Sequence, residues 1–311
     1  MKIVFMGTPE FGAGILNEIV KEFEVVLVVT QPDKEVGRKK LIEYSAVKKE
    51  ALALNIPVFQ PINIRKEYEY IINNFDFDLI VTAAYGQIVG TKLLDYPKFK
   101  AINVHGSLLP KYRGGAPIQR AIMNGDKTTG ITIMYMAKGM DSGDILVQKE
   151  IPILDSDNSD TMFEKLKILG ASMINKTIKD LEKGLLKPIP QNESLVTYAY
   201  NIDHSEEELD FTIHSSKEIF NIIRGLSSNP GAYFTINDFM IKVYSSSYSN
   251  DTSKYPMNTI CDVAKDHFSI ACKEGIISFY EIKPMGKGLM TVRDFMNGRG
   301  KNILILGAKI G

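Results

Sequence analysis

Short apolar runs alternate with longer amphipathic stretches along the first half of the chain. The stretches with apolar residues at helical spacing cover residues 10–21, 45–54 and 65–74. The runs between them are brief and largely apolar, as is typical of strands buried on both faces of a sheet, and they cover residues 3–6, 25–30, 79–83 and 101–105. This alternation predicts an α/β domain with a doubly wound, mostly parallel, Rossmann-like sheet and helices on both faces.

The pattern after residue 105 predicts how this domain ends. Residues 130–135 and 145–151 are expected to form a strand pair, and residues 159–184 a long amphipathic helix that begins at Ser159 and ends at Gly184. Residues 188–192 are rich in proline and polar side chains, so we place a linker at 188–204. The α/β domain is therefore expected to cover residues 1–187.

The texture of the chain changes from residue 205 onward. Residues 206–209 and 215–224 have a helical pattern. Short strand-like runs follow at 232–236, 240–244, 268–271 and 276–283, separated by clusters of Asn, Asp, Ser and Gly. Several short strands at this spacing predict a small β-barrel of the OB-like type, and we expect it to form a second domain over residues 205–311.

Length and charge limit the possible classes of protein. A chain of 311 residues is comfortable for two domains, and 44% hydrophobic residues is ordinary for a globular protein. Lys plus Arg and Asp plus Glu both number 37, so the overall charge does not indicate a nucleic-acid partner. If the chain binds RNA, the basic surface must be local.

Cysteine content and the N-terminus indicate the compartment. Cys261 and Cys272 are the two cysteines, and with no Cys/His cluster around them we expect neither a metal site nor a cofactor metal. Two free thiols are a simpler interpretation than one disulfide. The apolar start of the chain is too brief for a signal peptide, and no run approaches the ~20 apolar residues of a membrane span. These features predict a cytoplasmic protein without a membrane partner.

Three glycines, Gly7, Gly12 and Gly14, follow the first predicted strand. Their spacing differs from the GxGxxG of dinucleotide-binding turns, and the Lys-Ser/Thr pair of a phosphate-binding P-loop is absent. Since glycine permits a close approach of the backbone, we interpret the set as a tight strand-to-helix turn with close helix packing. NAD and ATP are therefore not expected as ligands.

The richest candidate site is the end of the fourth predicted strand. Asn103 and His105 flank Val104 there, so the two polar side chains share one face of the strand. In open α/β sheets, ligands bind beyond the carboxyl ends of the strands. A lone His is usually structural, but an Asn, a His and the following Gly106 meet where a ligand is expected, which favours a functional role.

A second candidate is Asp141, in a turn next to Gly143 and before the strand predicted at 145–151. An Asp in such a turn often only bonds its own backbone, and Asp144 fits that role better. Asp141 is then available as the carboxylate that orients and tunes His105.

The third candidate is the loop after the second predicted strand. Arg38, Lys39 and Lys40 lie in it, close to Lys34. A charged loop of this kind is often only solvated. The alternative is a loop that contacts the phosphates of an RNA and is ordered by it.

These motifs resemble the signatures of the folate-dependent formyltransferases. The stretch from Asn103 to Pro110, followed by Lys-Tyr-Arg-Gly-Gly-Ala-Pro at 111–117, resembles their central motif, and residues 139–146 resemble their second motif. The resemblance implies the family's catalytic triad at Asn103, His105 and Asp141. It also implies 10-formyltetrahydrofolate as formyl donor, with Ser107, Leu108, Leu109 and Pro110 against the folate, and it requires no metal.

The outer motifs favour the branch of this family that formylates the methionine carried by initiator methionyl-tRNA. Residues 29–40 resemble the tRNA-facing loop of that branch, which implies that Arg38, Lys39 and Lys40 contact the tRNA. Residues 229–232 and 295–299 resemble landmarks of its C-terminal barrel domain. The expected partners are initiator methionyl-tRNA and a reduced folate, with no DNA. The expected activity supplies formylated methionine for translation initiation.

Two alternatives stay open. One is a formyltransferase for a sugar nucleotide or a purine precursor, which would use the same triad but would not need the Arg38 loop or a second domain. The other is a non-catalytic RNA-binding module, against which the intact set of Asn103, His105 and Asp141 argues.

Overall fold

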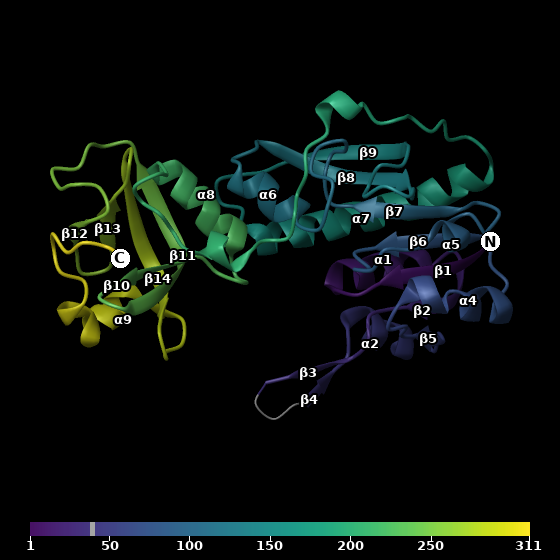
Figure 1. Cartoon of the computed structure of the whole chain (residues 1–311), viewed down its shortest axis with the longest axis horizontal. Coiled ribbons are helices and arrows are strands. Elements are labelled where there is room, and N and C mark those ends of the chain that lie inside the picture. Colours follow the sequence, from purple (N-terminus) through teal and green to yellow (C-terminus); the bar gives the residue numbers. More distant parts are fainter. Residues whose placement is uncertain (38–40) are drawn as a thin grey trace. The chain divides into compact units, whose positions relative to one another are not determined.

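The computed structural model describes residues 1–37 and 41–311 and divides into two compact units (Figure 1). The first unit comprises Met1–Pro117, Thr128–Pro152 and Phe163–Tyr200. The second comprises Ile118–Lys127, Ile153–Met162 and Asn201–Gly311. The predicted division into a domain at 1–187, a linker at 188–204 and a domain at 205–311 stays a prediction, and each unit is described by itself.

The first unit is built on one seven-stranded sheet. Its strands are parallel from the β5 edge to β7, and β8 and β9 then join antiparallel. The prediction of a mostly parallel α/β sheet is therefore confirmed. In spatial order the strands are β5 (Val58–Phe59), β2 (Glu24–Val29), β1 (Lys2–Gly7), β6 (Leu79–Ala83), β7 (Ala101–His105), β8 (Thr128–Tyr135) and β9 (Ile145–Pro152).

Helices cover both faces of this sheet. Side chains alternate between the faces along each strand, so a strand of apolar residues presents apolar side chains to both faces. On one face, Gly170 of α7 (Ser159–Glu182) lies against Ile15 of α1 (Glu10–Ile19) and Val104 of β7. On the other face, Val4 and Met6 of β1 join one apolar cluster with residues of three short helices. These helices are α3 (Ile64–Glu67), α4 (Glu69–Asn74) and α5 (Thr91–Leu94).

Two segments of the first unit differ in detail from their prediction. The single helix expected at 65–74 is two short helices that meet at Tyr68. The loop expected after β2 contains a hairpin, in which β3 (Lys34–Val36) pairs antiparallel with β4 (Leu41–Glu43). The helix α2 (Ala46–Ala53) follows, with Ser45 as its N-cap.

The second unit contains an antiparallel sheet that curls on itself (Figure 1). Its central strands β11, β14 and β13 pair in that order, with β10 and β12 at the two edges, and β15 pairs with β14. This agrees with the small barrel that was predicted. The strands are β10 (Tyr233–Ile236), β11 (Phe239–Ser249), β12 (Ile260–Val263), β13 (Phe268–Ala271), β14 (Ile276–Pro284) and β15 (Met290–Thr291).

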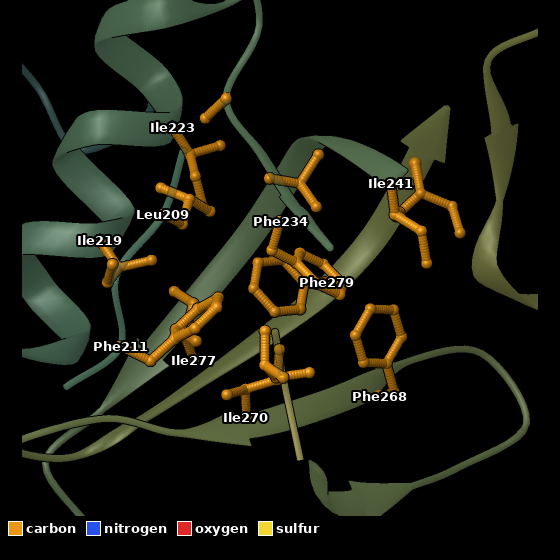
Figure 2. Packing of buried hydrophobic residues seen from close by; sticks show 14 of the residues in the cluster. Leu209, Phe211, Ile219, Ile223, Phe234, Ile241, Phe268, Ile270, Ile277 and Phe279 are labelled. Atoms are coloured by element: carbon orange, nitrogen blue, oxygen red, sulfur yellow. The ribbon is translucent and has the colours of Figure 1, made fainter. Parts of the chain in front are cut away.

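Phenylalanine side chains fill the inside of this sheet (Figure 2). Phe234 is fully buried, and its ring centre lies 5.9 Å from that of Phe211, 6.0 Å from that of Phe268 and 5.8 Å from that of Phe279. Ile219 and Ile223 of α8 (Ser216–Leu226) belong to the same core. The amphipathic face of α8 therefore packs over the sheet as its apolar periodicity requires. The shorter helical segments of this unit are α6 (Pro117–Met123), which begins at the last residue of the first unit, the 3-10 turns at His204–Glu207 and Arg299–Asn302, and α9 (Val292–Met296).

A buried arginine explains why residues 153–162 belong to the second unit. Arg224 of α8 donates from Nη1 to the carbonyl oxygens of Leu154 (2.8 Å) and Asp157 (3.1 Å), and from Nε to Asn221 (3.0 Å). Burial lowers the pKa of its guanidinium. Backbone oxygens thus hold a desolvated cation here.

Two further observations concern the state of the cysteines and the polarity of the helices. Cys261 and Cys272 are both free thiols, as expected. In the part of the chain that the structure describes, every helix is too short or too polar to cross a membrane.

Candidate active site

Three parallel strands end side by side at the carboxyl edge of the first sheet. These are β1, β6 and β7, which end at Gly7, Ala83 and His105. Gly7 and Gly12 can lie against β6 because neither has a side chain: a Cβ atom at either position would lie 2.9 Å from the Ala83 carbonyl oxygen. The interpretation of these glycines as a close-packed turn is confirmed.

Asn103 is oriented by a hydroxyl on the neighbouring strand. Thr82 Oγ1 lies 2.7 Å from Asn103 Oδ1, so the hydroxyl donates and the amide oxygen accepts. The other side of the amide, Nδ2, has no hydrogen-bond acceptor within the described residues. Thr82 therefore turns the two N–H donors of Asn103 away from β6 and leaves them available to a ligand.

His105 is buried, with 5% of its surface exposed, and its two ring nitrogens have different neighbours. Nε2 lies 2.9 Å from the Tyr112 carbonyl oxygen. Because a carbonyl oxygen only accepts, Nε2 must carry the proton in this contact. Nδ1 lies 3.6 Å from Asp141 Oδ2. Nδ1 is therefore the nitrogen that is left for proton transfer.

Asp141 faces His105 from the turn before β9. Its Oδ2 accepts a 2.9 Å hydrogen bond from the Gly114 amide. The Asp141 backbone has φ +45°, a left-handed conformation that is costly outside glycine and is found at functional sites. Tyr112, which binds His105, has φ +63°. Asn103, His105 and Asp141 thus stand at one strand edge, and two of the three are bound to backbone groups of residues 112–114.

The segment Ser107–Pro110 is tied to β8 and β9 by its backbone. Thr132 Oγ1 donates to the Ser107 carbonyl (2.6 Å) and accepts from the Leu109 amide (3.1 Å). Gln148 Nε2 donates to the Leu109 carbonyl (2.7 Å) and to Thr132 (2.8 Å). The Leu109–Pro110 bond is cis. These backbone groups are therefore engaged within the protein, and the half-buried side chains of the segment are those of Leu108 and Pro110.

The sequence did not single out Thr132 or Gln148. Thr132 is a polar residue in the middle of the apolar strand β8, and it has no exposed surface. A buried hydroxyl in an apolar strand must find a partner, which is the signal that could have identified it.

The loop after β6 forms another wall of this edge. The Tyr85 carbonyl accepts from Thr8 Oγ1 (2.9 Å) and from Gln31 Nε2 (3.2 Å). Gln87 accepts from the Ile64 amide and donates to the Pro61 carbonyl. Directly after Gln87, the Ile88 side chain is 71% exposed. The loop thus presents an apolar side chain on a well-held backbone.

The Tyr85 side chain lies in the apolar cluster beneath this loop. Its hydroxyl is buried and has no hydrogen-bond partner among the residues that the structure describes, and burial raises its pKa well above the usual range. The ring therefore packs beneath the loop and supports it.

This constellation fits acyl transfer. It offers amide donors at Asn103, one proton-accepting ring nitrogen at His105 and a carboxylate at Asp141 beside it. Among the described residues, no group of three His, Cys, Asp or Glu side chains could hold a metal ion. Arg38, Lys39 and Lys40 lie outside the described residues.

The sequence of this chain is similar to those of known proteins. Residues 1–178 match the family described as formyl transferase, and residues 201–300 match its C-terminal domain. A methionyl-tRNA formyltransferase of Listeria monocytogenes serovar 1/2a is 46% identical over 97% of this chain and 97% of its own. One of Lactobacillus johnsonii is 42% identical over 99% of this chain and 98% of its own.

Solved structures share the fold at low sequence identity. The N-formyltransferase from Helicobacter canadensis, in complex with folinic acid and dTDP-3-aminofucose, has a TM-score of 0.68 and 22% identity, over 90% of this chain and 98% of that one. HypX from Aquifex aeolicus has a TM-score of 0.65 and 14% identity over 97% of this chain. This chain spans about half, 48%, of that HypX chain.

Proposed function

The chain belongs to the methionyl-tRNA formyltransferases within the formyl transferase family, and we propose that it transfers the formyl group of 10-formyltetrahydrofolate to the amino group of methionine on initiator methionyl-tRNA. The product would be the formylated methionyl-tRNA that starts translation, made in the cytoplasm. The observation that carries the proposal is the set of Asn103, His105 and Asp141 at the carboxyl edge of the sheet.

The first task of the site is to stabilise negative charge. When the methionyl amine attacks the formyl carbon, the carbonyl oxygen becomes an oxyanion. We propose that Asn103 Nδ2 donates to it, because Thr82 occupies the amide oxygen of Asn103. A preorganised donor of this kind is worth about 10²- to 10³-fold in rate.

The second task is proton transfer. The amine must lose a proton as the new C–N bond forms, and the folate nitrogen must gain one as the old C–N bond breaks. His105 Nδ1 can take and return that proton, since Nε2–H is bound to the Tyr112 carbonyl. The Asp141 carboxylate, 3.6 Å from Nδ1, stabilises the imidazolium in between. This reaction needs no covalent bond to the enzyme and no metal.

The residues around the site fit a folate. Folate supplies an activated formyl group on a nitrogen next to flat, largely apolar rings. The exposed Ile88 and the half-buried Leu108 provide apolar surface near the strand ends. We propose that the segment Ser107–Pro110 and the loop after β6 hold the donor.

The tRNA contacts proposed from the sequence are Arg38, Lys39 and Lys40, with a second set near the C-terminus. The chain from residue 283 onward is markedly basic, with only Asp294 as an acid and with Lys283, Lys287, Arg293, Arg299, Lys301 and Lys309. Phosphate contacts of this kind contribute affinity that weakens as salt rises.

One assay tests the proposed function. Purified protein is given 10-formyltetrahydrofolate and, in parallel, methionyl initiator tRNA, a dTDP-linked amino sugar or glycinamide ribonucleotide. We expect transfer to the tRNA alone. Transfer to the sugar or the ribonucleotide in preference to the tRNA would contradict the proposal and favour a small-molecule formyltransferase.

The role of the basic loop has its own test. We expect Arg38→Ala to lower kcat/KM for methionyl-tRNA and to flatten its salt dependence, with binding of the folate nearly unchanged. An unchanged kcat/KM at every salt concentration would show that the loop is only solvated.

A further inference from the structure

The segment that follows α7, residues 188–200, runs beside the backbone of the candidate active site. We call it the connecting segment. Its residues Ile189 and Ile145 exchange two backbone hydrogen bonds. Thr197 accepts from the amides of Tyr112 (2.9 Å, through Oγ1) and Arg113 (2.9 Å, through its carbonyl). Ala199 donates to the Arg113 carbonyl over 2.7 Å. The segment therefore runs beside the backbone that holds the catalytic groups.

One side chain of this segment, Gln191, reaches both catalytic turns. Its Nε2 donates to the carbonyl oxygens of Asp141 and Gly143, each over 2.8 Å. Its Oε1 accepts from Nε (3.0 Å) and Nη2 (2.9 Å) of Arg113. The amide thus uses both donors and both acceptor sites, and Gln191 is half-buried between exposed residues.

Arg113 fixes the other end of this bridge. Only 4% of it is exposed, and it also binds the Glu193 carboxylate (2.7 Å from Nη2 and 3.3 Å from Nη1), which lowers the pKa of Glu193. Arg113 stands between Tyr112, whose carbonyl binds His105, and Gly114, whose amide binds Asp141. Gln191 therefore connects the two backbone stretches from which His105 and Asp141 are oriented.

Each of the two turns that this bridge joins contains a residue with a positive φ. Tyr112 and Asp141 both have positive φ, and residues in this conformation persist only when their surroundings hold them. Thr197 bonds the Tyr112 amide, and Gln191 bonds the Asp141 carbonyl. We expect these contacts to hold both turns, and with them the 3.6 Å approach of Asp141 to His105.

We propose that Gln191 is a positioning residue of the active site, which sets the distance between Asp141 and His105 by holding the Asp141–Gly143 turn against Arg113. The proposal rests on the proposed function for its kinetic consequences, although the geometry itself does not. Gln191 contacts only protein groups in this role, so it acts through Asp141 and His105.

Gln191→Glu separates the two halves of the bridge. The variant keeps an acceptor for Arg113 but turns an oxygen toward the carbonyls of Asp141 and Gly143. We expect kcat to fall about 10- to 100-fold, because a misplacement of about 1 Å in an active site costs about 100-fold. KM for both substrates should change little. Gln191→Met, which removes both halves at similar volume, serves if Gln191→Glu does not fold.

Glu193→Gln is the matched control. It weakens another contact of Arg113, on an exposed side chain, without touching the Asp141 turn. Its kcat should stay within about 2-fold of wild type. An equal loss in Glu193→Gln and Gln191→Glu would show that both variants act by loosening Arg113, which would overturn the assigned role.

A double-mutant cycle with Asp141→Asn gives the decisive result. If Gln191 acts through Asp141, Gln191→Glu should cost much less in the Asp141→Asn background than in wild type, and both single variants should change the pH profile of kcat in the same way. Independent, multiplicative effects, or a folded Gln191→Glu enzyme with wild-type kcat, would overturn the proposal.

A measurement without substrate separates this proposal from the proposed function. The pH titration of the His105 ring, followed by NMR, should change in Gln191→Glu in the same direction as in Asp141→Asn and stay unchanged in Glu193→Gln. If the wild-type protein formylates none of the acceptors tested, the proposed function fails, and this titration still decides whether Gln191 positions the pair. An unchanged titration in Gln191→Glu would refute it.

Discussion

The carboxyl edge of the first sheet and the inside of the second sheet both contain buried side chains, but those at the edge are polar and those inside the second sheet are apolar. His105, Ser107, Arg113 and Thr132 are polar, at most 5% exposed, and each is hydrogen-bonded. The cluster around Phe234 consists of buried apolar side chains (Figure 2). A buried polar group needs directed partners, whereas a buried ring needs only close packing. Substitutions in the first region should therefore mainly lower the reaction rate, and substitutions in the second should mainly lower the stability of the fold.

The largest effect is expected from His105→Ala. Loss of the ring that we propose accepts the proton should lower kcat by about 10²-fold or more, because general acid–base groups contribute about 10²- to 10⁴-fold. Thermal unfolding should change far less than in a core variant. Near-normal turnover would contradict the assignment of His105 and would place the chemistry elsewhere.

Phe234→Ala tests the opposite side of the comparison. Truncation of a fully buried phenylalanine should destabilise the protein by about 3–5 kcal/mol, measured by denaturant unfolding. The formyl transfer rate per folded molecule should remain near wild type. The control is Tyr255→Ala, an aromatic residue in the same unit with 36% of its surface exposed, which should cost much less. Equal costs would mean that the phenylalanine cluster is not the stabilising core.

A smaller and sharper effect is expected from Thr82→Val, which keeps the shape of the side chain but removes the hydroxyl that orients Asn103. A neutral hydrogen bond contributes about 0.5–1.5 kcal/mol, so kcat should fall about 2- to 10-fold. KM should be unaffected, because the proposed role of Asn103 is to stabilise the oxyanion. A wild-type kcat in a folded variant would show that Asn103 keeps its orientation without Thr82.

The smallest effect concerns Glu206, whose carboxylate accepts from Arg120 over 2.5 and 2.9 Å. These bonds lower the pKa of Glu206 below its usual 4.5, so its stabilising contribution is present above about pH 4.5 and is lost as the pH falls further. The pair is partly exposed, so we expect Glu206→Gln to cost less than about 1 kcal/mol at neutral pH. The unfolding midpoints of variant and wild type should converge in acid; a constant difference from neutral to acidic pH would contradict the ionic origin.

The sequence was informative where structure is local. Strands β6 and β7 begin and end at the predicted residues, because each is a short apolar run between turns. In contrast, β11 continues through residues 245–249, where serines suggested a loop and pairing with β14 decided the structure. Pattern alone also missed β12, whose neighbours in the chain are polar.

The candidate site shows the same limit. Asn103, His105 and Asp141 could be proposed from their local motifs, and they keep the status of proposals. Their supports could not, since Gln191 is 78 residues from Arg113 and 50 from Asp141 along the chain. A glutamine in a proline-rich stretch carries no sign of its partners, which only the folded path of the connecting segment brings together.

The connecting segment also has a consequence for exchanging modules between relatives. A chimaera that joined this sheet to a foreign C-terminal module at residue 187 would discard Gln191, Thr197 and Ala199 together. The proposed catalytic and folate-binding residues would all be present, yet the turns that contain Tyr112 and Asp141 would have lost their attachment. A junction after Tyr200, the last residue of the first unit, takes the connecting segment and the catalytic turns from the same protein and so keeps their hydrogen bonds. Splice points in such hybrids should therefore follow the hydrogen bonds of the segment rather than its proline-rich appearance.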